Sequence, residues 1–116
     1  MKIYATRSSV HPGDDIEAPH PQDFENPESA ALDAAIADIA KKYLPSIFGG
    51  KATWSVCSNV VLGVLAQQWS APKMYLYFKD QIDIRDGVVC LHFNYHMQLE
   101  PQAVYDIFWG MRLRAQ

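Results

Sequence analysis

Cysteine is scarce in this chain of 116 residues, which contains only Cys57 and Cys90. A plant-type iron–sulfur cluster needs four cysteine ligands, so the sequence excludes a cluster of that kind. Both cysteines fall in strand-like segments, where a reduced thiol packs as a small hydrophobic side chain. A Cys57–Cys90 disulfide stays open as an alternative if the two segments are neighbouring strands. We expect the protein to need no cofactor.

Long apolar runs are also missing. The longest one, Val60–Ala66, is far too short to cross a bilayer. The first residues, Met1–Arg7, lack the apolar stretch of a signal peptide. The sequence therefore predicts a cytoplasmic protein that has no membrane partner.

Lysine and arginine are absent from Ser8 to Ala40, although the net charge of the whole chain is only −3. A block of one sign is usually a solvated surface, and the alternative is an electrostatic footprint for a basic partner. Because no basic stripe is interleaved with aromatic residues, we expect no nucleic-acid ligand. The acidic residues of this block are Asp14, Asp15, Glu17, Asp23, Glu25, Glu28, Asp33 and Asp38.

The segment from Val88 to Leu99 alternates apolar and polar side chains. Successive side chains of a strand point to opposite faces of a sheet, so this pattern predicts an antiparallel strand with one face on a core. The apolar face would carry Val89, Leu91, Phe93, Tyr95, Met97 and Leu99. The polar face would carry Cys90, His92, Asn94, His96 and Gln98.

Two segments have the signals of helices. In the first, Asn26 is a capping residue, Pro27 suits the first turn, and Glu28 meets the positive end of the helix dipole. In the second, Glu100 and Pro101 precede apolar residues at helical spacing. The sequence therefore predicts helices over residues 27–44 and 101–112.

The remaining segments predict strands over residues 2–10, 51–57, 60–69 and 74–78, and a short strand at 22–25 stays open. Ser58 and Asn59 are expected to form a hairpin turn, and Ile82 and Ile84 are expected to point inward. The whole chain, residues 1–116, is thus predicted to be one α+β domain. It would have a single mixed sheet of four to five strands packed by a central helix, with an extra C-terminal helix. The expected core includes Trp54, Leu91 and Phe93.

This order of elements resembles that of the ubiquitin-like β-grasp fold from Met1 to Met97, with the last helix as an addition. The segments Tyr43–Ile47 and Gly49–Trp54 also resemble a group of small uncharacterised bacterial proteins. The β-grasp resemblance implies a domain that binds other proteins through its sheet or its loops.

The polar face of the segment from Val88 to Leu99 is the main candidate for chemistry. His92 and His96 would lie roughly 13 Å apart on a strand. That separation is too long for one zinc ion, whose ligands lie about 2.0–2.3 Å from the metal. The sequence also has no nucleophile elbow and no phosphate-binding glycine loop, so we expect no enzyme and no metal site. A small metal-binding protein or enzyme that uses Cys90, His92 and His96 stays the alternative.

The acidic block and the aromatic content of 12 % favour a protein-binding function. We expect a non-catalytic immunity protein that binds and neutralises a cognate bacterial toxin, such as a nuclease with a basic cleft. An accessory subunit of a larger complex is a further alternative, the Cys90–Gln98 face is a second candidate interface, and the oligomeric state stays open. The residues expected to bind a basic toxin domain are Asp14, Asp15, Ile16, Glu17, Asp23, Phe24 and Glu25.

Overall fold

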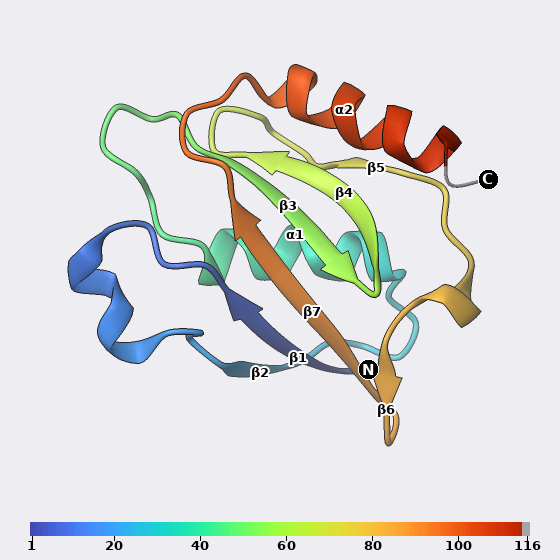
Figure 1. Cartoon of the computed structure of the whole chain (residues 1–116). Helices are drawn as coiled ribbons and strands as arrows, with labels where there is room; N and C mark the ends of the chain where they lie inside the picture. Colours follow the sequence, from blue (N-terminus) through green and yellow to red (C-terminus); the bar gives the residue numbers. More distant parts are fainter. Residues whose placement is uncertain (115–116) are drawn as a thin grey trace.

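The first and last long strands of the chain, β1 (Lys2–Arg7) and β7 (Val88–Tyr95), lie side by side and parallel inside one sheet (Figure 1). The computed structural model describes residues 1–114. Its mixed sheet has the order β2-β1-β7-β3-β4-β5, and β6 pairs with β7. The other elements are η1 (Pro12–Glu17), β2 (Gln22–Glu25), α1 (Leu32–Tyr43), β3 (Thr53–Ser58), β4 (Val60–Ala66), β5 (Lys73–Met74), η2 (Lys79–Gln81), β6 (Ile84–Arg85) and α2 (Pro101–Arg114). The protein is therefore α+β, as predicted.

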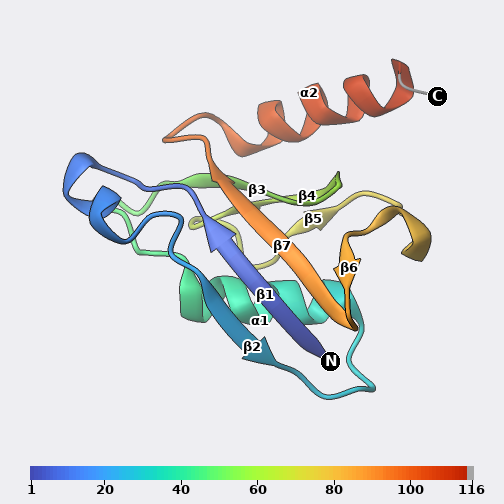
Figure 2. The ribbon, with the colours of Figure 1, turned by 60° about the horizontal axis from the view of Figure 1, so that its bottom comes forward.

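Helix α1 covers one face of the sheet, and the main core lies between the two (Figure 2). Leu91 and Phe93 of β7 point to this face because they alternate with polar residues along the strand. Ile36 and Ile39 of α1 are buried opposite them. The predicted core residues Trp54, Leu91 and Phe93 are all buried.

Helix α2 lies on the opposite face, where it packs on β4 (Figure 2). Val64 and Tyr75 form a second, smaller core with Val104 of the helix. The ring of Tyr75 stacks on Tyr105 with ring centroids 4.6 Å apart, and the Arg112 guanidinium lies 5.1 Å from the Tyr75 ring. Neither helix in the described residues 1–114 has the length and apolar composition that a membrane span requires.

The first helix starts later than predicted, at Leu32 rather than at residue 27. Both residues are engaged elsewhere, because the Asn26 backbone carbonyl and the Glu28 carboxylate accept hydrogen bonds from the N-terminal ammonium group of Met1, at 2.6 Å and 2.9 Å. The Asn26 N–H also donates to the Met1 carbonyl, which continues the pairing of β1 with β2. Residues 26–28 are therefore held as a turn beside the start of β1, and the helix begins after it.

The last long strand ends at Tyr95, four residues earlier than predicted. Met97 adopts a left-handed backbone with φ of 55°, which turns the chain out of the sheet. Thr53 fixes this turn by donating its N–H to the Met97 carbonyl and its hydroxyl to the Leu99 carbonyl. The predicted inward orientation of Met97 and Leu99 is wrong, since the two residues are 60 % and 55 % exposed.

The sheet has seven strands rather than four to five, because the segment left open at 22–25 forms strand β2 and the connection before β7 contributes the two-residue strand β6. The strand predicted over 74–78 is reduced to Lys73–Met74, after which the chain leaves the sheet. Ile84 is exposed in β6, contrary to the prediction, whereas Ile82 packs against the core as expected. The predicted hairpin turn is confirmed, with Asn59 between β3 and β4 at φ of 64°.

Candidate functional site

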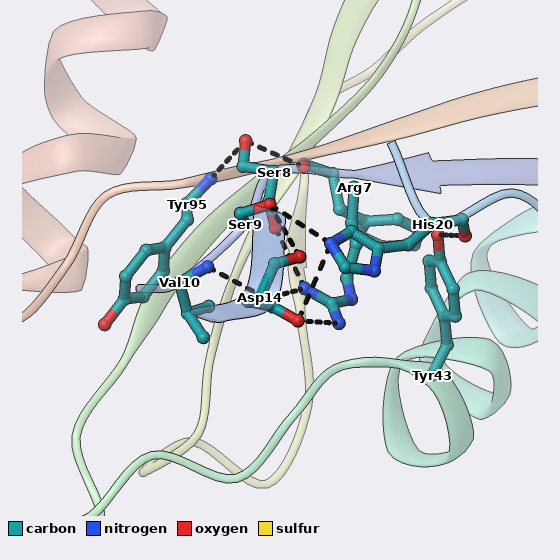
Figure 3. Close-up of polar contacts among 9 residues, drawn as sticks. Arg7, Ser8, Ser9, Val10, Asp14, His20, Tyr43 and Tyr95 are labelled. Carbon is teal, nitrogen blue, oxygen red and sulfur yellow. Dashed lines mark hydrogen bonds and ion pairs between the residues drawn. The ribbon is translucent and has the colours of Figure 1, made fainter. Parts of the chain in front are cut away.

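The loop between β1 and β2, residues 8–21, is held in place by a partly buried ion pair at its base (Figure 3). Arg7 at the end of β1 donates two hydrogen bonds, of 2.8 Å and 3.3 Å, to the Asp14 carboxylate. Asp14 also accepts the Val10 N–H at 3.0 Å. Only 11 % of the Arg7 side chain and 18 % of the Asp14 side chain are exposed. We call residues 8–21 the η1 loop.

A second set of contacts ties the η1 loop to helix α1 (Figure 3). The His20 ring nitrogen Nε2 lies 3.1 Å from the Ser9 hydroxyl and 3.6 Å from the Asp14 carboxylate. The Tyr43 hydroxyl of α1 donates to the His20 carbonyl. The Arg7 N–H donates to the Pro19 carbonyl at 2.9 Å. The loop is therefore anchored at both ends, by the sheet and by the helix.

The protonation states of this cluster follow from its contacts. The hydrogen bond from Arg7 is the main cause that lowers the pKa of Asp14 to about 2, with the Val10 N–H and the nearby charges acting in the same direction and burial opposing them. Burial raises the pKa of Tyr43 to about 12. At neutral pH the cluster thus contains a carboxylate anion and a neutral phenol.

The predicted contact residues Asp15, Ile16 and Glu17 project from the η1 loop and are exposed. Ile16 is 90 % exposed, which is unusual for a large aliphatic side chain. Asp23 and Glu25 are exposed on β2, an edge strand of the same sheet. The structure therefore places five of the seven predicted residues at the surface.

The other two predicted residues point inward. Asp14 makes the partly buried ion pair described above, and Phe24 packs edge-on against the Tyr43 ring with centroids 5.6 Å apart. Phe24 lies opposite Ile3 in the sheet, on the face that α1 covers. Both residues shape the region instead of presenting a surface.

Much of the acidic block is neutralised or bonded within the chain. Glu28 pairs with the N-terminal ammonium group at 2.9 Å, Asp38 pairs with Lys42 at 2.9 Å, and Asp33 accepts the Tyr77 hydroxyl at 2.6 Å. Glu25 lies 3.8 Å from the N-terminal ammonium group. Among the side chains that the structure describes, Asp15, Glu17 and Asp23 have no ion-pair partner.

The polar side chains of β7 lie on the sheet face opposite α1, beside neighbours from β1 and β3. Thr6 and Cys57 occupy the positions opposite His92 on the two adjacent strands. The Thr6 hydroxyl and the His92 Nδ1 atom share a hydrogen bond of 2.6 Å, and the Asn94 amide donates to the Cys57 sulfur at 3.7 Å. Cys57 and Cys90 are both free.

The two cysteines on this face do not have the lowered thiol pKa that a cysteine nucleophile needs. Burial raises the pKa of both Cys57 and Cys90, so the thiols are protonated at neutral pH. His96, one residue beyond β7, hydrogen-bonds the Ser55 hydroxyl of this same face at 2.8 Å, beside Phe108 of α2. Within residues 1–114 no three His, Cys, Asp or Glu side chains gather closely enough to hold a metal ion.

Sequence reasoning missed the residues that anchor the η1 loop, which are Arg7, His20 and Tyr43. Arg7 is the last basic residue before the acidic block, and that position was an available signal for an ion pair. No signal in the sequence pointed to His20 and Tyr43, because their contact joins a loop to a helix residue 23 positions further along the chain.

No protein-family model, curated protein or solved structure matches this chain.

Proposed function

We propose that the protein is a non-catalytic binding domain that engages a basic protein partner through the tip of the η1 loop, residues Asp15–Glu17. The observation that carries this proposal is Ile16, which is 90 % exposed between two carboxylates on an anchored loop. An exposed apolar side chain flanked by charge has the composition of an interface anchor with a polar rim.

The anchoring contacts matter for affinity. Ordering a loop on binding costs free energy, and a loop that is already ordered avoids that cost. The Arg7–Asp14 ion pair and the Tyr43 hydrogen bond to the His20 carbonyl fix the base of the η1 loop before any partner arrives. These contacts therefore hold the backbone on both sides of the tip that carries Ile16.

The charge of the region supports a basic partner. Asp15 and Glu17 flank Ile16, and Asp23 lies on the following strand β2, all of them without an ion-pair partner among the described side chains. Uncompensated carboxylates of one sign accelerate association with a basic surface, and salt weakens the effect. A bacterial nuclease toxin has a basic phosphate-binding cleft, so we propose toxin immunity as the biological setting.

We also propose that the domain is of the β-grasp type. Three features support this: the strand–strand–helix order, the single helix α1 across one face of the sheet, and the return of β7 beside β1 in parallel.

The test is a binding titration against the protein encoded by the adjacent gene, at low and high ionic strength. We expect Ile16→Ser to weaken binding by on the order of tenfold or more, as for an interface hot spot. Asp15→Asn with Glu17→Gln should slow association mainly at low salt. Matched controls are Phe48→Ser, another fully exposed apolar residue, and the remote exposed pair Asp80→Asn with Asp86→Asn. Equal losses in the test and control variants would place the interface elsewhere.

A further inference from the structure

A small cavity lies between helix α1 and the loop that joins β4 to β5. Its volume is about 200 Å³. Helix α1 contributes Ala37, Ala40 and Leu44 to its wall, and the loop contributes Trp69 and Pro72. None of the described residues that line it belongs to the η1 loop, so this cavity is separate from the loop tip to which we assign partner binding.

Small side chains on α1 leave the space open. Ala37 and Ala40 are three residues apart and therefore face the same side of the helix. The buried side chains of Trp54 and Leu65 close the cavity toward the core. An apolar cavity of about 150 Å³ holds one benzene molecule. The observed volume is thus enough for one six-membered ring with a short substituent.

Two tryptophans give the cavity an aromatic lining. Trp54 comes from β3 and Trp69 from the loop after β4. Contacts between aromatic rings contribute more than the burial of the same area of saturated hydrocarbon. The lining therefore favours an aromatic ring over a saturated ring of equal size.

The charge of the cavity is positive. Within the part of the chain that the structure describes, Lys41 is the only charged residue that lines it, and no described ion pair includes Lys41. The Lys73 ammonium lies 5.4 Å from the centre of the Trp69 ring, which adds positive charge nearby. The nearby acid on α1, Asp38, is paired with Lys42 at 2.9 Å.

The negative end of the α1 dipole opposes an anionic ligand. A helix end is equivalent to roughly half an elementary charge, and the ammonium group of Lys41 carries a full one. The lysine therefore dominates, and an anionic group at the opening of the cavity is favoured over a cationic one.

We propose that this cavity binds a small aromatic carboxylate with a single ring, with the ring against Trp54 and Trp69 and the carboxylate beside Lys41. Burial of the ring supplies most of the affinity. Lys41 is exposed, so its ion pair with the ligand supplies selectivity of a few fold. A ligand of about ten non-hydrogen atoms should bind with a dissociation constant on the order of a millimolar.

The experiment is an NMR titration of the full chain with phenylacetate. We expect saturable shifts at the indole N–H groups of Trp54 and Trp69 and at the Ala40 amide. Three compounds of matched size serve as comparisons: neutral phenylacetamide, cationic phenethylamine and saturated cyclohexylacetate. Phenylacetate should bind at least about threefold more tightly than the amide and the amine, and about twofold more tightly than cyclohexylacetate. Equal binding of acid, amide and amine would overturn the proposal and assign the cavity to an uncharged apolar group.

Two variants and one control locate the site. Ala37→Leu fills the cavity and should abolish the saturable shifts. Lys41→Gln should weaken phenylacetate about three- to fivefold and leave phenylacetamide unchanged, and its exposed position keeps the test valid if Ala37→Leu does not fold. Lys42→Gln removes the neighbouring ammonium group that pairs with Asp38 and should change neither ligand.

Two results would overturn the proposal: no saturable shift with phenylacetate on the order of 10 mM, or shifts that neither Ala37→Leu nor Lys41→Gln alters. Neither result would bear on the η1 loop, because the cavity and the loop tip share no residue.

Discussion

The Arg7 guanidinium lies 2.8 Å from the Asp14 carboxylate and thereby joins the end of β1 to the first turn of the η1 loop. Among the described ion pairs, Arg7 is the only lysine or arginine that contacts the η1 loop, so it offsets part of the acidic block. Because the pair is shielded from solvent, its interaction is stronger than that of an exposed pair. The loop tip gains its fixed position from this contact.

We expect Asp14→Asn to destabilise the protein by about 1–2 kcal/mol at pH 7. This magnitude follows from the lowered pKa, because one unit of pKa shift corresponds to about 1.4 kcal/mol. The folded-state pKa of Asp14 is lowered to about 2 from an ordinary value of 3.8, so the stabilisation is present above pH 4. It is lost as the pH falls toward 2. Urea denaturation at pH 7 and at pH 2–3 measures this difference. Asp15→Asn is the control, because Asp15 is exposed and should change the stability by less than about 0.5 kcal/mol.

The sheet and its main core could be predicted because the decisive signals are local. Alternation along β7 determined the burial of Leu91 and Phe93, and Glu100–Pro101 marked the start of α2 correctly. The start of α1 could not be predicted from Asn26 and Glu28. The Asn26 backbone carbonyl and the Glu28 carboxylate bind the N-terminal ammonium group, a partner distant in sequence that no capping pattern reveals.

The candidate site was predicted at the level of the segment but not of the side chains. Composition identified the acidic block, and the structure places Asp15, Ile16 and Glu17 at its surface. Composition could not separate these from Asp14 and Phe24, because inward orientation depends on Arg7 and on the Tyr43 ring of α1. A contact between elements distant in sequence leaves no periodic signal.

Acidification from pH 7 to pH 5 should lower the stability of the protein through His96. Burial lowers the pKa of this histidine in the folded state, so the unfolded chain takes up a proton first as the pH falls below about 6.5. Stability therefore rises with pH in this window. His96→Gln removes the titrating ring, and we expect a smaller slope of the urea midpoint against pH. His11→Gln, at an exposed position, should keep the slope of the unaltered protein; equal slopes for His96→Gln and the unaltered protein would contradict the prediction.

Phe93→Ala is expected to destabilise the protein by about 3–5 kcal/mol, because it empties a large volume in the core. The Phe93 side chain is fully buried and its ring meets the Tyr43 ring at a centroid distance of 6.0 Å. Thermal and urea denaturation measure the loss. Phe48→Ala removes the same atoms from an exposed position and should change little. Similar effects in the two variants would mean that Phe93 lies on the side of β7 that points away from the core.

Gly63→Ala should destabilise the edge of the sheet, because β4 and β5 approach each other closely at this residue. A β-carbon at position 63 would lie 2.5 Å from the Met74 sulfur and 2.8 Å from the Lys73 carbonyl oxygen. The sulfur belongs to a flexible side chain that can move, whereas the carbonyl oxygen is part of the backbone of β5. We expect a loss of about 1–3 kcal/mol, as for an overpacked interior site.

Met74→Ala in the Gly63→Ala background removes the contact with the sulfur and leaves the contact with the carbonyl. It should therefore recover only part of the loss, relative to Met74→Ala alone. Full recovery in this double-mutant cycle would show that β5 can shift freely, and that the short strand does not constrain the position of Tyr75 beneath α2.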